Sequence, residues 1–418
     1  MTPPPTVWSF KDARIVLPAR ALASGGQAMA MITLVLSIHD SGAGPLGITG
    51  LMLAMTIPAI AFMGVAGHVA DSVDSRTVLV TSGLAQVLCI VAPTVASGLA
   101  PTFALAAAFS AASVFSSPVW SALVPRIVGD ELIGKAISWQ QGLSATVSPF
   151  AGALAGVAYG AWGRTTPLVI SAALTLTLVA AAVSVRTRRG GRHDEALAGE
   201  NTSGAARVGL GIIRRDGLLF PLFVGLFVIV LALEGVNVVE VFLARDELGA
   251  SPAEYGLSEL FFGAGSIAGA ALAARFTSNG ARARAGAVGF GVAGLSIVAS
   301  GLAPAFWVYL VLATGIGGAA AISNAAVGAL LMSRVPDAHR GKVGAALNGT
   351  MRIASVAALG LGGIVGAALG PRLTFIGGGA LSAIAALVAL LSLRPALRAE
   401  PELTADPAAP SRPRPVRR

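Results

Sequence analysis

Apolar residues recur along the chain in uninterrupted stretches of about twenty, separated by shorter segments rich in polar and charged residues. The stretches are continuous rather than alternating, which favours helices over strands. A helix of about 20 apolar residues crosses the hydrocarbon core of a bilayer. Inside that core only helices and closed barrels satisfy their own backbone hydrogen bonds. The pattern therefore predicts an all-α polytopic membrane protein.

The spacing of these stretches predicts twelve spans, and the longest hydrophilic segment lies between the sixth and the seventh. We expect a polar N-terminal segment over 1–14, a six-helix bundle over 15–185, a central loop over 186–217, a second bundle over 218–393 and a disordered tail over 394–418. The predicted spans are 15–38, 47–69, 78–99, 103–124, 134–158, 165–185, 218–242, 254–275, 285–302, 305–332, 343–368 and 372–393.

Composition agrees with a membrane protein. Charged residues make up only 12% of the 418 residues and mean hydropathy is +0.78, whereas a soluble domain carries roughly 25% charged residues. The net charge of +9 would favour nucleic-acid binding in a soluble protein. In a polytopic protein it has a simpler explanation, because basic residues collect in cytoplasmic loops.

The distribution of basic residues tests that explanation. Of the 29 Lys and Arg residues, 24 fall on the side of the two termini, 3 on the other side and 2 inside spans. This asymmetry predicts that both termini are cytoplasmic, and it excludes nucleic acid as the partner that the charge implies. The excess of Arg over Lys and the abundance of Ala favour a GC-rich bacterium, so we expect the bacterial inner (plasma) membrane.

The two halves are related in sequence. Several residues around the entrance of span 5 recur 207 positions later around the entrance of span 11, which indicates two six-helix repeats in parallel register. The pairs are Val128 and Val335, Asp130 and Asp337, Gly134 and Gly341, Lys135 and Lys342, Gly142 and Gly349, and Ser148 and Ser355.

The loop between spans 2 and 3 carries Gly67, Asp71 and Arg76 in a Gly-x-x-x-Asp arrangement followed by a basic residue. It resembles the signature loop of the major facilitator superfamily, in which the loop locks the cytoplasmic helix ends in one access state. The resemblance implies the two-bundle fold, a transport function and a protein that acts as a monomer. Serines replace two basic residues of that pattern, at positions 72 and 75.

Span 5 carries Pro149 and Gly152 in an element similar to the Gly-Pro-x-x-Gly motif of the superfamily's antiporters. Together with the segments 118–125 and 237–243, it resembles the branch that contains enterobactin and macrolide exporters. The resemblance implies a conformational gate made by Gly67, Asp71, Arg76, Pro149 and Gly152. A close-packing seam is an equally open interpretation of the span 5 residues.

No metal cluster, nucleophile constellation or phosphate-binding loop is visible, so we expect neither an enzyme nor a cofactor. Ionisable residues inside spans are costly and are candidates for function. Glu234 lies well inside span 7, and Asn237 and Glu240 follow at three-residue steps on one helical ridge. We predict that Glu234 and Glu240 couple transport to protons. The alternatives are a structural carboxylate for Glu234 and a solvated helix end for Glu240.

Arg352 lies inside span 11, one turn after Asn348. A buried Arg needs a carboxylate or carbonyl partner, and Glu234 or Glu240 is the candidate. Arg352 either binds an anionic substrate or tunes this Glu; a purely structural ion pair or snorkelling to the cytoplasm is the alternative. Arg20, near the start of span 1, is expected to pair with cytoplasmic loop groups, and Trp120 and Trp139 to anchor the interface. The predicted substrate-cavity residues are Asn237, Arg352, Asn348, Gln141, Gln27 and Asn324.

The sequence therefore predicts a secondary exporter that moves an amphipathic or hydrophobic small molecule, such as a drug, siderophore or natural product, by alternating access in exchange for protons. Two alternatives stay open. One is a nutrient importer or facilitator of the same fold, which needs a more polar cavity. The other is a membrane sensor or scaffold that does not transport.

Overall fold

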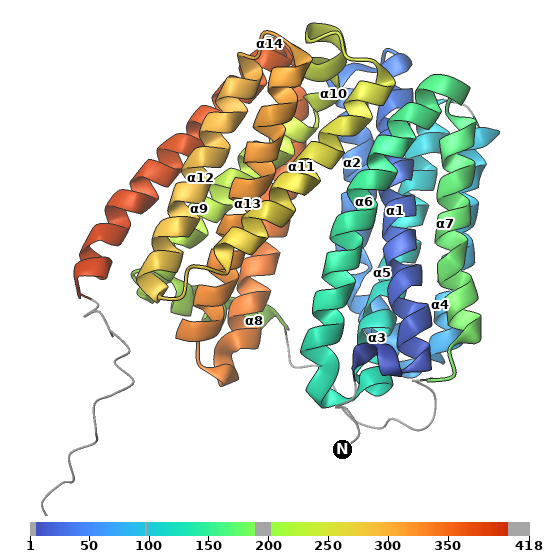
Figure 1. The fold of residues 1–418 in the computed structure, drawn as a ribbon, viewed down its shortest axis with the longest axis horizontal. Coiled ribbons are helices and arrows are strands. Elements are labelled where there is room, and N and C mark those ends of the chain that lie inside the picture. The colour runs from blue at the N-terminus through green and yellow to red at the C-terminus, as the bar shows by residue number, and fades with distance from the viewer. Residues whose placement is uncertain (1–5, 97, 189–201, 400–418) are drawn as a thin grey trace, which may run out of the picture.

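The computed structural model describes residues 6–96, 98–188 and 202–399, and these residues form helices without strands (Figure 1). The elements are α1 (Lys11–Asp40), α2 (Gly44–Ala61), α3 (Met63–Ser72), α4 (Ser75–Val91), α5 (Leu99–Val128), α6 (Ile133–Trp162), α7 (Thr165–Ser184), α8 (Thr202–Arg215), α9 (Leu219–Asn237), α10 (Glu240–Phe242), α11 (Pro252–Ala273), α12 (Asn279–Gly301), α13 (Phe306–Arg334) and α14 (Asp337–Ala399).

The twelve predicted spans correspond to these helices. Ten of the described helices are long and apolar enough to cross a membrane. One of them, α14, contains two predicted spans, because Gly370 has φ 81° and breaks the helix. The remaining span is α6, a 30-residue helix whose polar residues lower its hydropathy. Predicted span 2 comprises α2 and α3, which meet at Phe62. The predicted fold class is confirmed.

The helices pack into two groups that lie side by side (Figure 1). Helices α1 to α7 pack on one another, and α9 to α14 do the same. We call the end of the molecule with the N-terminus and α8 the terminus side, and the end with α10 and Gly370 the opposite side. The two groups meet mainly through α6 against α11 and α2 against α14, and the ribbons diverge toward the terminus side (Figure 1).

Small residues allow α6 and α11 to touch backbone to backbone, an arrangement we call the seam. A Cβ on Gly156 would lie 2.9 Å from the Cα of Gly256 and closer still to the carbonyl oxygen of Pro252. Gly263 of α11 lies against the ring of Pro149. The Pro149 and Gly156 face of α6 is therefore the contact surface between the two bundles, as expected where helices pack closely in lipid.

The second interface joins α2 to the first half of α14. Gly363 lies directly against the side chain of Thr49, whose hydroxyl donates to the carbonyl of Leu359 at 3.4 Å. Gly366 lies against Val239 and Pro45. Each of these contacts lies in the half of the spans nearer the opposite side, so the bundles are closed at that end.

The central segment contains a helix that the sequence analysis did not predict. Helix α8 is amphipathic and packs on α14, where Gly209 lies against the backbone of Lys342 and Val343. Helix α14 continues to Ala399, so the predicted tail from 394 begins within it. The rest of that tail lies outside the described residues, as do residues 1–5 of the N-terminal segment predicted over 1–14. Helix α1 begins within that segment, at Lys11.

Asp216 ties the junction of α8 and α9 to the end of α13. Its Oδ1 accepts hydrogen bonds from the amides of Leu218 and Leu219, each at 2.9 Å, and its Oδ2 accepts one from Arg334 Nε at 2.8 Å. Burial by itself would raise the pKa of Asp216, but the bonds from Arg334 and the two amides outweigh it and hold the pKa below its usual range.

Asp216→Asn keeps an oxygen that accepts the two amide hydrogen bonds, but it removes the charge that pairs with Arg334. The loss of this ion pair is expected to destabilise the protein by about 1 kcal/mol. The pKa of Asp216 is lower in the folded state than in the unfolded state, where it is about 3.9. Its charge therefore adds to the free energy of unfolding above that value, and this stabilisation is lost as the pH falls through the folded-state pKa. Thermal unfolding of both proteins in detergent between pH 7 and pH 3 should show the difference in Tm shrinking below about pH 4. A difference that is constant over this range would contradict the assignment.

Gly156→Val is expected to open the seam. Overpacking costs about 1–3 kcal/mol, which lowers the population of the seam-closed state by roughly 5- to 150-fold. Spin labels at Ser138 of α6 and Met332 of α13, in a Cys89→Ser background, report the separation of the bundles on the terminus side; we expect it to shorten. Gly160→Val is the matched control, because its Cβ would lie 3.7 Å from Pro252, an ordinary contact. Equal effects of the two variants would refute the seam.

Candidate functional site

Two polar cavities lie within the spans, one on each bundle. The first, which we call the Arg20 cavity, has a volume of about 450 Å³. Polar groups of α1, α5 and α6 line most of it, with no carboxylate among them: Arg20, Ser24, Gln27, Ser110, Ser113, Ser116, Ser117, Trp120, Gln140, Gln141 and Ser144.

Helical periodicity explains this lining. Arg20, Ser24 and Gln27 of α1 are spaced by four and three residues, so they share one face of the helix. The serines of α5 follow the same spacing over two turns, as do the polar residues of α6. The sequence pattern therefore marks one polar stripe on each helix, and the packing turns all three stripes toward the same space.

The predicted pairing of Arg20 with loop groups is wrong. Arg20 lines the cavity and also a neighbouring one of about 220 Å³; across the described residues it makes no hydrogen bond or ion pair. The predicted interface role of Trp120 is also wrong, because this side chain is only 3% exposed and its Nε1 has no partner. Trp139 is 48% exposed and packs edge to face against Trp8.

The second cavity, which we call the Glu240 pocket, has a volume of about 170 Å³ and lies in the second bundle. Tyr309 donates a hydrogen bond of 2.6 Å from its hydroxyl to Glu240 Oε1. Glu259 of α11 also lines the pocket, and its Cβ and Cγ lie against Gly152 in the seam. Phe262, Phe375 and aliphatic side chains form most of the remaining wall, which contains no basic residue.

Sequence reasoning missed Glu259. The signal was available, because Glu259 is an ionisable residue inside predicted span 254–275, and an intramembrane carboxylate is a functional candidate. Only the tertiary structure shows that it shares a pocket with Glu240, since the two residues belong to different helices. Glu240 is therefore not a solvated helix end, the alternative that the sequence left open.

The other predicted cavity residues divide into two groups. Asn237 lines the Glu240 pocket, and Gln27 and Gln141 line the Arg20 cavity. The cavities described above do not include the remaining predicted cavity residues, Asn324, Asn348 and Arg352. They also do not include Glu234, which was predicted to couple protons. Helix geometry explains why Glu234 lies outside the pocket that contains Glu240. The two residues are two three-residue steps apart, and each step turns the helix by about 300°. Glu234 and Glu240 thus point about 120° apart even before the break between α9 and α10.

The predicted ion pair of Arg352 with Glu234 or Glu240 is wrong. Arg352 is exposed and makes no ion pair among the described residues, and Glu240 is bonded by Tyr309. Asn348 is also exposed and donates to the carbonyl of Gly344 in its own helix at 3.0 Å.

The signature loop lies at the terminus side. Gly67 and Asp71 belong to α3 and Arg76 to the first turn of α4. Asp74 caps α4 by accepting hydrogen bonds from the amides of Arg76 and Thr77. Arg76 Nη2 donates to the carbonyl of Val185 at 2.8 Å and so joins α4 to the end of α7. The gating role of these residues stays a prediction.

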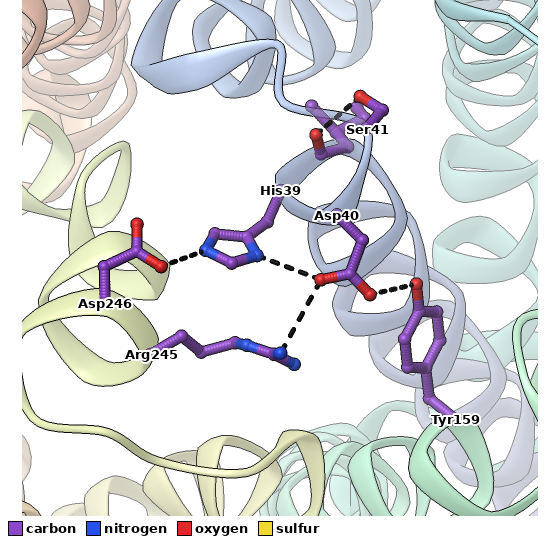
Figure 2. Close-up of polar contacts among 7 residues, drawn as sticks. His39, Asp40, Ser41, Tyr159, Arg245 and Asp246 are labelled. Atoms are coloured by element: carbon purple, nitrogen blue, oxygen red, sulfur yellow. Dashed lines mark hydrogen bonds and ion pairs between the residues drawn. The ribbon is translucent and has the colours of Figure 1, made fainter.

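At the opposite side a polar cluster crosses between the bundles, as Figure 2 shows. His39 of α1 lies between two carboxylates, with Nε2 2.9 Å from Asp246 Oδ1 and Nδ1 3.0 Å from Asp40 Oδ1. Asp40 also accepts a 2.8 Å hydrogen bond from the hydroxyl of Tyr159 and lies 3.7 Å from Arg245 Nη2. We call these five residues the latch.

The latch is a weak closure. Asp40 is 41% exposed and Asp246 57% exposed, and exposed ion pairs contribute at most about 1 kcal/mol each. His39 donates to both carboxylates only when both ring nitrogens carry a proton, which makes the ring cationic. The seam and the α2–α14 contact thus supply the shape of the closed end, and the latch adds charge complementarity across it.

A model of one protein family matches residues 16–244 and 222–418 of the chain, and that family is the Major Facilitator Superfamily. The chain belongs to this superfamily. It is therefore a membrane-embedded, multi-pass transporter rather than an enzyme, and small molecules are the substrates of such transporters.

Similar proteins agree with this assignment. The chain is 24% identical over 388 residues to the uncharacterized MFS-type transporter YfiS of Bacillus subtilis (strain 168), a match that covers 91% of this chain and 93% of the relative. The fold of the present chain is similar to that of a bacterial homologue of the human lysosomal transporter Spinster in an inward-facing conformation. The TM-score is 0.69 at 14% identity, and the match covers 93% of this chain and 98% of the homologue. The nucleoside transporter NupG gives TM-score 0.69, 12% identity and coverage of 92% and 99%.

Asp40→Asn is expected to weaken the latch, because this carboxylate is shared by His39, Tyr159 and Arg245. The population with the opposite side closed should fall by up to about fivefold, the equivalent of 1 kcal/mol. The spin-label pair at Ser138 and Met332 reports this change as a larger fraction of short distances. Glu131→Gln removes an exposed carboxylate at the terminus side and should leave the distances unchanged. Unaltered distances in Asp40→Asn would show that the latch does not hold the bundles.

Proposed function

We propose that this superfamily member is a secondary active exporter of an amphipathic or hydrophobic small molecule, and that it works by alternating access in exchange for protons. The observation that carries the proposal is the position of Glu259. This carboxylate shares a small pocket with Glu240 and lies against Gly152 in the seam between the bundles. It is therefore at the place where a change of bundle arrangement alters the surroundings of an ionisable group.

The arrangement of the bundles supports an inward-facing state. The contacts of the seam, of α2 with α14 and of the latch all lie toward the opposite side. The excess of Lys and Arg at the terminus side favours a cytoplasmic location for that side. With that orientation, the Arg20 cavity is accessible from the cytoplasm, where an exporter takes up its substrate.

The Glu240 pocket supports proton coupling. Glu240 and Glu259 lie in a mostly apolar wall without a basic residue, and a proton held by the pair neutralises one of two charges that are costly inside a membrane. Opening the seam separates Glu259 from Gly152 and changes its access to water. A proton bound in one state is thereby released in the other. Tyr309 orients Glu240 through its hydrogen bond.

Import is the second candidate, and one observation favours it. The Arg20 cavity is lined by serines and glutamines and is more polar than the sequence analysis expected for an exporter of hydrophobic compounds. An importer or facilitator of a polar nutrient uses such hydrogen-bonding groups. The direction of gradient-driven movement separates the two candidates, and a sensor or scaffold would move nothing in either direction.

The test uses inverted membrane vesicles that are acidified inside, with a panel of amphipathic fluorescent dyes that includes a lipophilic cation and a lipophilic anion. We expect accumulation inside the vesicles that nigericin abolishes. Glu240→Gln and Glu259→Gln should reduce it to the level of vesicles without the protein, because a neutral amide cannot carry the proton. Glu234→Gln tests the carboxylate predicted from sequence in the same assay.

Three outcomes are informative. Loss of transport in Glu240→Gln or Glu259→Gln with normal transport in Glu234→Gln supports the pocket as the coupling site. Loss only in Glu234→Gln moves the coupling role to that residue. Normal gradient-dependent transport in all three variants overturns proton coupling by carboxylates of this region.

A further inference from the structure

We propose that Arg20 anchors a subsite for an oxyanion, so that the transported molecule is amphipathic and carries a carboxylate or a similar anionic group that binds in the Arg20 cavity. This inference names a substrate class for the proposed transport function and rests on the use of that cavity for substrate. Nothing in the sequence analysis or in the similarity to known transporters assigns Arg20 a ligand.

The first observation is an Arg without a counter-charge. Arg20 lies nine residues into α1, about 14 Å along the helix axis from Lys11 at 1.5 Å per residue. Intramembrane Arg residues ordinarily pair with carboxylates or carbonyls. Neither cavity that Arg20 lines contains an Asp or Glu, and within the described part of the chain Arg20 makes no hydrogen bond or ion pair. Its positive charge is open to a ligand.

The second observation is a group of unused polar side chains around the same cavity. Trp120 is 3% exposed, and its buried Nε1 has no hydrogen-bond partner. Gln27 and Gln141 line the cavity and form no side-chain hydrogen bond among the described residues. A guanidinium fork with neighbouring N–H donors matches the geometry of a carboxylate, which accepts two parallel hydrogen bonds.

The chain also separates the two signs of charge. The Arg20 cavity carries a cation and no carboxylate, whereas the Glu240 pocket carries two carboxylates and no basic residue. An anionic group is repelled from the pocket of the second bundle and attracted to the cavity of the first. A volume of about 450 Å³ is in the range of small-molecule sites. Substrate anion and coupling proton thus occupy different bundles.

The test measures binding to the purified full-length protein in lipid nanodiscs, with fluorescence of empty nanodiscs subtracted. Two related dyes are compared: 1-anilinonaphthalene-8-sulfonate, an amphipathic anion, and N-phenyl-1-naphthylamine, the same ring system without the sulfonate. We expect the protein to bind the anion with saturation and more tightly than the neutral dye. Arg20→Gln should weaken anion binding by about tenfold or more, the scale of one charge-assisted contact, and leave the neutral dye unaffected.

Two further variants complete the design. Arg20→Lys keeps the charge but not the guanidinium fork, so its affinity for the anion should lie between those of the wild type and Arg20→Gln. Arg284→Gln removes an exposed charge at the terminus side of α12 and should change neither dye. If Arg20→Gln does not fold, Gln141→Ala gives a second test, because it removes an amide that lines the same cavity. It should lower the affinity for the anionic dye and leave the affinity for the neutral dye unchanged.

The proposal is overturned if the wild-type protein binds the anion no better than the neutral dye. It is also overturned if Arg20→Gln or Gln141→Ala lowers the affinity for both dyes equally. The same holds if Arg284→Gln lowers the affinity for the anionic dye as much as Arg20→Gln does. Binding needs no proton gradient and no transport direction, so its failure is distinguishable from failure of proton-coupled export in vesicles.

Discussion

The direct backbone contact between α6 and α11 is the constraint on which the rest of the arrangement depends. In a bilayer, apolar side chains gain little from leaving lipid for protein, so helices associate through close packing of small residues. Gly156 against Gly256 and Gly263 against Pro149 supply that packing between the bundles. The same seam brings the side chain of Glu259 against Gly152, and thereby places a carboxylate at the surface that must separate when the bundles move.

The closed end must be held firmly enough to be populated and loosely enough to open. A two-state protein functions when its states differ by a few kcal/mol. The seam leaves no room for side chains larger than those present, whereas the two carboxylates of the latch, Asp40 and Asp246, are about half-exposed, so their ion pairs contribute modestly. Strong packing over a small area with weak charge pairs at its rim is consistent with a contact that forms and breaks in each transport cycle.

The two bundles carry opposite chemistry in their cavities. One presents Arg20 among serines and glutamines, and the other presents Glu240 and Glu259 among aromatic and aliphatic side chains. The repeat in the sequence relates the two bundles, but the charged residues differ between them, because function is carried by side chains placed on a shared scaffold. The proposed substrate anion and coupling proton would therefore bind in different bundles, on the two sides of the seam.

The sequence by itself determined the all-helical membrane fold, the twelve spans and the basic excess on one side, because these follow from hydropathy along a single chain. It also marked Glu240, Gln27 and Gln141 as polar residues in apolar runs. Only the tertiary structure decided which of these face a common cavity. Rotation about each helix axis placed Glu259 beside Glu240, turned Glu234 and Arg352 away and left Arg20 unpaired. Packing against neighbouring helices sets that rotation, and a one-dimensional pattern does not contain it.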